Sequence, residues 1–196
     1  MLFALVITLY TSRVILNTLG IQDYGIYNVV AGFVSLFAFL NATLSSSMQR
    51  FYNFQIGSVG DNGIAKVYTT GLWIHVLLAV IIILILETFG VWYVNNIMVM
   101  PEDRLFAANI LYQIVVVSAV LLILQIPYIG AIMAYERMDF YAIISIIDVV
   151  FKLAIVLVLP YINLDKLIVY AFLLVTDNEE TIYVFIFYTQ NENFLQ

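Results

Sequence analysis

The sequence lacks cysteine, has one histidine, His75, and has few charged residues, and these shortages exclude several classes of protein. Without cysteine there is no disulfide, no thiolate nucleophile and no cysteine-ligated metal. No segment carries a pair of carboxylates at a spacing useful for general acid–base chemistry, a metal-ligand cluster or a glycine-rich phosphate loop. We therefore predict that the protein is not an enzyme and that it needs no metal and no other cofactor.

Charged residues make up 10% of the 196 residues, whereas hydrophobic residues make up 64%. Several uncharged runs are longer than the roughly 18–20 residues that a helix needs to cross a bilayer. The net charge of -6 is not accompanied by any basic cluster, so we expect no binding to nucleic acid. The composition predicts an all-α, polytopic transmembrane bundle in contact with membrane lipids.

The apolar runs predict five spans and the beginning of a sixth. The expected spans are residues 1–21, 24–44, 67–86, 105–135 and 140–161. Residues 167–176 are uncharged, but a run of ten residues is too short to cross the hydrocarbon core alone. We therefore expect a bundle of five to six spans over residues 1–176, followed by a polar and aromatic tail, residues 177–196, that does not span.

Shorter signals refine this pattern. The sequence Gln-Asp-Tyr-Gly at residues 22–25 predicts a tight turn between the first two spans. The polar residues 45–65 predict a connection whose first part can continue the second span as a helix. Pro127 predicts a kink or an end inside the fourth span.

Arginine inside an apolar span is the most informative feature of the sequence. Arg13 lies on one predicted helix face with Tyr10, Asn17 and Gly20, at spacings of +3, +4 and +3. A charge at mid-membrane costs roughly 2.5–3.5 kcal/mol on insertion scales, so it normally faces water or a partner. A guanidinium is also well suited to phosphate. We predict that Arg13 and Asn17 contact an anionic substrate; the alternative is a structural arginine paired to a carbonyl or carboxylate.

Three further residues are candidates. Arg50, near the end of the second span, is a third substrate-contacting residue or else an interfacial anchor that snorkels. Asp148 and Lys152 are separated by four residues in the fifth span and form either an ion-coupling site or an intrahelical pair that lets two charges enter the membrane together. The second interpretation of this pair is favoured. His75 is interpreted as an ordinary packed histidine rather than a proton relay.

Two stretches of the sequence resemble a known family of transporters. Residues 9–51 (LYTSRVILNTLGIQDYGIYNVVAGFVSLFAFLNATLSSSMQRF) are similar to the opening of bacterial polysaccharide-biosynthesis transporters of the O-antigen flippase type. Residues 126–156 (IPYIGAIMAYERMDFYAIISIIDVVFKLAIV) form the second similar stretch. These transporters belong to the multidrug/oligosaccharidyl-lipid/polysaccharide exporter superfamily. The resemblance covers about residues 1–175 and only the first half of the family's fold.

The resemblance implies a MATE-like transporter of two helical bundles around a central cavity, of which this chain is similar to the N-terminal one. It implies a multi-pass protein of the bacterial inner membrane that exports lipid-linked (pyrophosphate) oligosaccharide for lipopolysaccharide or other surface polysaccharide, together with a second bundle. One alternative is a small-molecule or drug exporter on a similar fold. A cation exporter should have acidic residues on the first two spans, whereas the one acidic residue in this region, Asp23, lies in the predicted turn between them. The other alternative is a truncated membrane protein that transports nothing.

Overall fold

The computed structural model of the protein describes residues 2–35, 38–58, 63–162 and 164–176, and within these ranges the regular elements are all helical. The expectation of an all-α fold is thereby confirmed for the described part of the chain. The predicted tail, residues 177–196, lies outside the described residues. The elements, in chain order, are α1 (Leu2–Ser35), α2 (Ala38–Ser58), α3 (Ile64–Ile85), a π-helical segment (Leu86–Gly90), α4 (Val91–Asn96), a 3-10 turn (Glu102–Arg104), α5 (Leu105–Leu124), α6 (Ile126–Ala134), α7 (Met138–Val158), a second 3-10 turn (Leu159–Tyr161) and the helix Lys166–Thr176.

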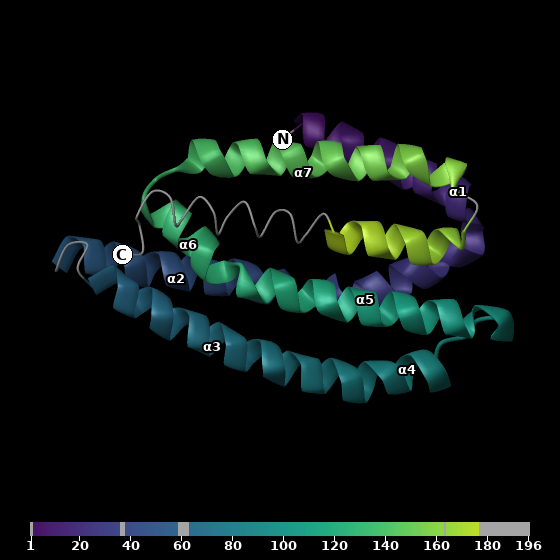
Figure 1. Cartoon of the computed structure of the whole chain (residues 1–196), viewed down its shortest axis with the longest axis horizontal. Coiled ribbons are helices and arrows are strands. Elements are labelled where there is room, and N and C mark those ends of the chain that lie inside the picture. Colours follow the sequence, from purple (N-terminus) through teal and green to yellow (C-terminus); the bar gives the residue numbers. More distant parts are fainter. Residues whose placement is uncertain (1, 36–37, 59–62, 163, 177–196) are drawn as a thin grey trace.

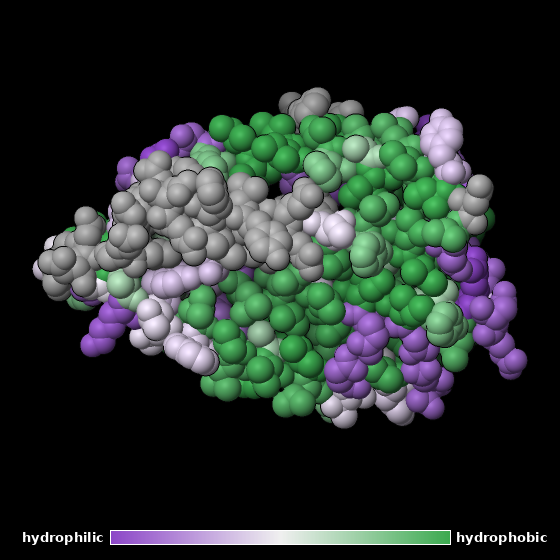
Figure 2. Space-filling model, viewed as in Figure 1, coloured by the Kyte–Doolittle hydropathy of each residue, from purple (hydrophilic) through white to green (hydrophobic). Residues whose placement is uncertain are grey.

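Three stretches of helix in the described residues are long and apolar enough to cross a membrane: Ile64–Asn96, Glu102–Ala134 and Met138–Tyr161. They correspond to the expected spans at residues 67–86, 105–135 and 140–161. The helix Lys166–Thr176 is apolar but shorter, as its sequence predicts. The long helices run side by side (Figure 1). Apolar residues cover most of the middle of the face in Figure 2, and hydrophilic residues gather toward its ends. The count of five to six spans and the two-bundle arrangement stay predictions.

The prediction of a tight turn at residues 22–25 is wrong, because the bend in α1 occurs at Gly20. Those four residues are helical, whereas Gly20 has φ 83° and ψ 168°. Only glycine adopts this positive φ without a steric cost, so a single residue is enough to redirect the helix. Asp23 and Tyr24 therefore project from a helix beside the bend rather than from an exposed loop.

The other two local expectations are confirmed. The polar sequence after residue 45 continues as helix to the end of α2 at Ser58. The fourth expected span is divided at Gln125, where α5 ends, and Pro127 lies in the first turn of α6. Proline is well tolerated there because the first turn of a helix needs no amide donor from it.

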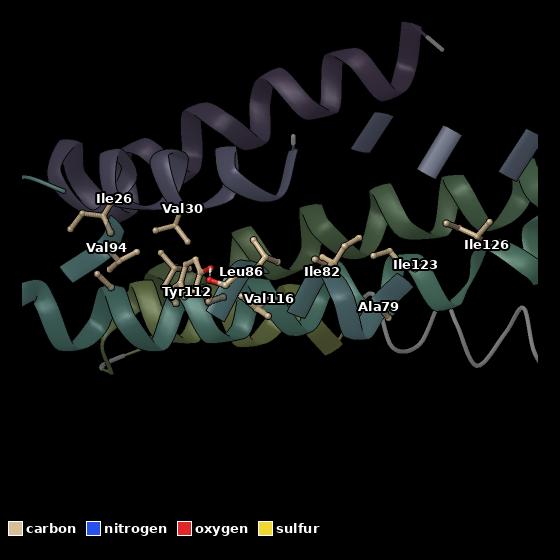
Figure 3. Packing of buried hydrophobic residues seen from close by; sticks show 14 of the residues in the cluster. Ile26, Val30, Ala79, Ile82, Leu86, Val94, Tyr112, Val116, Ile123 and Ile126 are labelled. Carbon is tan, nitrogen blue, oxygen red and sulfur yellow. Dashed lines mark hydrogen bonds between the residues drawn. The ribbon is translucent and has the colours of Figure 1, made fainter. Parts of the chain in front are cut away.

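The main core is formed by α1, α2, the α3–α4 region, α5, α6 and the helix Lys166–Thr176, and Tyr112 of α5 lies in it between Val94 and Leu86 (Figure 3). The Tyr112 hydroxyl donates to the carbonyl oxygen of Leu86 at 2.6 Å, at the start of the π-helical segment. The tyrosine ring fits because position 90 is glycine: a Cβ there would lie 1.8 Å from the Tyr112 hydroxyl oxygen. The π-helical segment and Gly90 thus make the room that α5 needs to pack against α3 and α4.

Close contact also joins α2 to α6. Met48 is buried between the two helices and α3, and a Cβ on Gly130 would lie 2.8 Å from the Met48 Cβ. A Cβ on Gly71 of α3 would likewise be too close to the end of the Met48 side chain. Small residues at such crossings let helix backbones approach one another, which is the usual packing of helices in membranes.

Candidate functional site

A cavity of about 320 Å³ lies between the two arms of α1, α7 and the helix Lys166–Thr176. In Figure 1 the helix Lys166–Thr176 lies beside α7, in the interior of the fold. The cavity lining combines hydroxyl, amide and aromatic side chains with a few aliphatic ones. The lining residues are Ile7, Thr8, Thr11, Ser12, Ile15, Tyr24, Tyr27, Asn28, Val149, Lys152, Tyr170 and Leu174.

The sequence periodicity of α1 explains why these residues line one cavity. Thr8, Thr11, Ser12 and Ile15 are spaced by three or four residues around one helix face, and so are Tyr24, Tyr27 and Asn28. The bend at Gly20 separates the two groups and turns both faces toward the same space. A straight helix could not place both groups around one cavity.

Some polar groups of the cavity are bonded within their own helix, and one has no partner. The Ser12 hydroxyl donates to the Thr8 carbonyl oxygen at 2.9 Å, and the Asn28 amide donates to the Tyr24 carbonyl oxygen at 2.7 Å. The Thr11 hydroxyl oxygen is buried and bonds to nothing among the described residues. Buried polar groups are nearly always bonded, so Thr11 points to a ligand or a water in the cavity.

The Asp148–Lys152 pair forms one wall of the cavity through Lys152. The Lys152 ammonium donates to both carboxylate oxygens of Asp148, at 2.7 and 2.8 Å. The predicted ion pair within one helix is therefore confirmed as a contact. A role in coupling transport to an ion stays a prediction.

The predicted substrate-contacting residues do not line this cavity. Arg13 and Asn17 are exposed on the far side of α1, and Tyr10 on the same face is 53% exposed. No hydrogen bond or ion pair joins Arg13 to another residue that the structure describes. Arg50 is exposed on α2. The common helix face of Tyr10, Arg13 and Asn17 is confirmed, and substrate contact stays a prediction.

A cluster of three charged residues escapes sequence analysis. Arg104 donates to Asp23 at 2.6 Å and to Asp165 at 2.7 Å, and we call these three residues the Arg104 cluster. The second Asp165 oxygen accepts the Leu167 amide at the start of the helix Lys166–Thr176. The cluster thus joins the bend of α1, the start of α5 and the start of that helix, which lie at one end of the fold (Figure 1). Arg104 is 81 positions from Asp23 and 61 positions from Asp165 in the sequence, so no local pattern predicts either contact. The one hint in the sequence is a lone aspartate in apolar surroundings, which needs a partner.

Burial raises the pKa of Asp23 above the ordinary aspartate value, against the opposing effect of the Arg104 guanidinium. The residue is only 5% exposed, and its second carboxylate oxygen has no hydrogen-bond partner in the described part of the chain. Nearby carboxylates of Asp165 and Asp103 raise the pKa further. The charged form of Asp23 is therefore disfavoured by burial and by the neighbouring carboxylates, and the Arg104 guanidinium opposes both effects.

His75 is buried in α3, as expected of a packed histidine. Its Nδ1 donates to the Gly71 carbonyl oxygen at 2.7 Å, and its Nε2 has no partner within the described residues. The described residues include no group of three or more histidine, aspartate or glutamate residues that could hold a metal ion.

No protein-family model, no curated protein and no solved structure matches this chain.

Proposed function

We propose that this chain is the N-terminal bundle of a bacterial inner-membrane flippase that exports lipid-linked oligosaccharide for surface polysaccharide. A second helical bundle, packed across the exposed side of α1 and α2, completes the passage. Arg13, Asn17 and Arg50 contact the pyrophosphate and its first sugar in that passage. Rocking of one bundle against the other carries the headgroup across.

The observation that supports this proposal is the exposed position of Arg13 on α1, where it bonds to none of the described residues. Exposure of arginine to lipid costs roughly 2.5–3.5 kcal/mol, so this face of α1 belongs against water or a partner. On α2, Thr43, Ser47 and Arg50 are also exposed, opposite the buried side chains of Met48 and Tyr52. Both helices thus carry polar residues on faces that their own bundle leaves uncovered.

Other faces of the bundle have the character expected against lipid. Trp73, Leu77 and Leu84 are exposed on α3. On α7, large aliphatic and aromatic side chains such as Ile143 and Phe151 are exposed. The exposed faces of α1 and α2 also carry apolar side chains such as Leu9 and Phe51, but they add Arg13, Asn17 and Arg50. This difference favours an arrangement in which lipid surrounds α3 and α7 and the passage follows α1 and α2.

An exporter of cations is less well supported by the same geometry. Asp23 is the one acidic residue in α1 and α2, and its carboxylate already accepts a hydrogen bond from Arg104. A cation site needs several oxygen ligands around the ion, whereas Asp23 is a single buried carboxylate with one oxygen already bonded to Arg104. The positively charged face of α1 and α2 suits an anionic headgroup instead.

Complementation of a flippase-deficient bacterial strain tests the proposal, with this chain fused to or co-expressed with the second bundle of a flippase. Arg13→Ala should abolish glycan export without changing the amount of protein in the membrane. Arg13→Lys should keep part of the export, because it preserves the charge but loses the forked donors. Lys66→Ala, which removes an exposed cation at the start of α3, is the matched control and should export normally. Full export by Arg13→Ala would overturn the proposal, and loss of the protein would assign Arg13 a structural role.

A further inference from the structure

We propose that the cavity between α1, α7 and the helix Lys166–Thr176 binds a neutral polyhydroxylated ring, which is one sugar residue. The identification of the ring as a sugar rests on the proposed function, whereas the preference for a neutral, hydroxyl-bearing ligand follows from the cavity itself. This site is separate from the exposed Arg13 face, since the two lie on opposite sides of α1.

Charge in the cavity excludes most ionic ligands. Among the described residues Lys152 is the one charged residue in the lining, and its ammonium is bonded to both oxygens of Asp148. The pair is neutral as a whole. A bound anion would need to compete with the Asp148 carboxylate for the ammonium, and a bound cation would face that ammonium without a carboxylate of its own in the lining. A neutral ligand meets neither cost.

The hydrogen-bonding groups in the cavity favour a polar ligand over an acyl chain. The buried Thr11 hydroxyl can both donate and accept, and it has no partner among the described residues. The Asn28 amide uses a donor on the Tyr24 carbonyl, so its side-chain oxygen is placed to accept. The Ser12 hydroxyl also keeps its accepting lone pairs. An acyl chain would leave these groups unbonded, at a cost of about 1–3 kcal/mol each.

Aromatic rings supply the complementary surface for the carbon face of a sugar. Tyr27 and Tyr170 pack edge to face, with ring centroids 5.1 Å apart, and Tyr24 also lines the cavity. Pockets for small ligands typically combine such apolar and aromatic walls with a few oriented polar groups, and they measure roughly 300–1,000 Å³. A cavity of about 320 Å³ lies at the small end of that range and suits a ligand of one ring.

Binding of free monosaccharides to the purified full chain in detergent, measured by saturation-transfer NMR, tests the proposal. Galactose and N-acetylglucosamine should bind with a roughly millimolar Kd, as expected for ligands of this size. Cyclohexanol, a ring of similar size with one hydroxyl, should not compete, and the charged sugars glucosamine and glucuronate should bind about tenfold more weakly. Equal binding of cyclohexanol, or no binding of either neutral sugar, would overturn the proposal.

Substitutions in the lining locate the binding. Thr11→Val and Asn28→Leu should each weaken sugar binding about five- to tenfold, because each removes a hydrogen-bonding group and keeps the side chain's size. Thr11→Ser keeps the hydroxyl and should bind normally, which separates loss of binding from loss of folding. The matched control for Asn28→Leu is Asn96→Leu, since the Asn96 amide also donates to the carbonyl four residues earlier but lies outside the cavity. Thr69→Val is the control for Thr11→Val: it removes a threonine hydroxyl that is exposed on α3 and bonded to the Ala65 carbonyl. Binding that is unchanged in Thr11→Val and Asn28→Leu would place the sugar outside this cavity.

The two proposals fail in different ways. Export that requires Arg13, together with no binding of neutral sugars by the purified chain, would overturn the cavity assignment and leave the transport proposal in place. Sugar binding that depends on Thr11, together with normal export by Arg13→Ala, would overturn the transport proposal and leave the cavity assignment in place.

Discussion

Two arginines, Arg104 and Arg13, show how differently this chain uses a charge in apolar surroundings. Arg104 donates to two carboxylates from distant segments, Asp23 and Asp165, at 2.6 and 2.7 Å. Arg13 is exposed on the α1 helix and bonds to none of the described residues. A guanidinium whose donors are used within the fold stabilises that fold, whereas one that is left unused is available to a ligand. We infer that Arg104 holds the bundle together and that Arg13 acts outside it.

The Asp148–Lys152 pair is intermediate between these arginines. Its charges are bonded to each other within one helix, yet Lys152 also lines the cavity. The pair joins no distant segments, so its removal should affect folding less than removal of Arg104.

Arg104→Ala should cause the largest loss of stability. It leaves the Asp23 and Asp165 carboxylates near each other without their cation. A fully buried pair broken in this way costs about 3–5 kcal/mol, and the loss here should lie below that range because the Arg104 and Asp165 side chains are 30% and 32% exposed. Arg104→Lys should lose less, because an ammonium keeps the charge but cannot reach both carboxylates with a fixed fork. Denaturant titration of the purified chain in detergent measures the free energy of unfolding.

Arg137→Ala is the control for Arg104→Ala. Arg137 is paired with Asp139 at 3.6 Å, and both side chains are well exposed. Such surface pairs contribute about 0–1 kcal/mol. Equal losses for the two substitutions would contradict the structural role of the Arg104 cluster.

Substitution of one partner in the Asp148–Lys152 pair should have the next largest effect. Asp148→Asn or Lys152→Gln leaves an unpaired charge in an apolar helix, at a cost of about 2–3 kcal/mol. The double variant should regain most of that stability, since it leaves no charge behind. A double-mutant cycle on unfolding free energies measures the coupling. A double variant as unstable as its parents would indicate that each residue has a separate partner.

Titration of Asp23 should have a smaller effect on stability, and this effect should depend on pH. Burial raises the pKa of Asp23 in the folded protein, so the native state keeps a proton that the unfolded chain releases near its ordinary value. Stability contributed by the protonated carboxyl is therefore full at low pH and is lost as the pH rises through the raised pKa. Asp23→Asn keeps an acceptor for Arg104 and removes this titration. The Tm of the parent should fall relative to that of Asp23→Asn as the pH rises above the ordinary aspartate pKa and through the raised one; parallel profiles would contradict the assignment.

Sequence patterns predicted the features that depend on neighbouring residues and missed those that depend on distant ones. The all-α fold, the break near Pro127 and the Asp148–Lys152 contact follow from hydropathy, proline chemistry and a four-residue spacing. The bend was misplaced because Asp-Tyr-Gly is a common turn signal, whereas the conformation of Gly20 carries no such signature. The Arg104 cluster and the cavity bring together residues more than fifty positions apart, which no local pattern encodes.

Arg13→Ala should have the smallest effect on the free energy of unfolding, in contrast to Arg104→Ala. Substitution of an exposed side chain with no bonded partner normally changes the free energy of unfolding by less than about 0.5 kcal/mol. The same titration in detergent, run beside Arg104→Ala, measures it. A large loss would show that Arg13 has a structural partner and would remove it from the proposed passage. A negligible loss, combined with loss of export in cells, can be explained only by a contact that the isolated bundle does not make, which is the behaviour expected of a substrate-contacting residue.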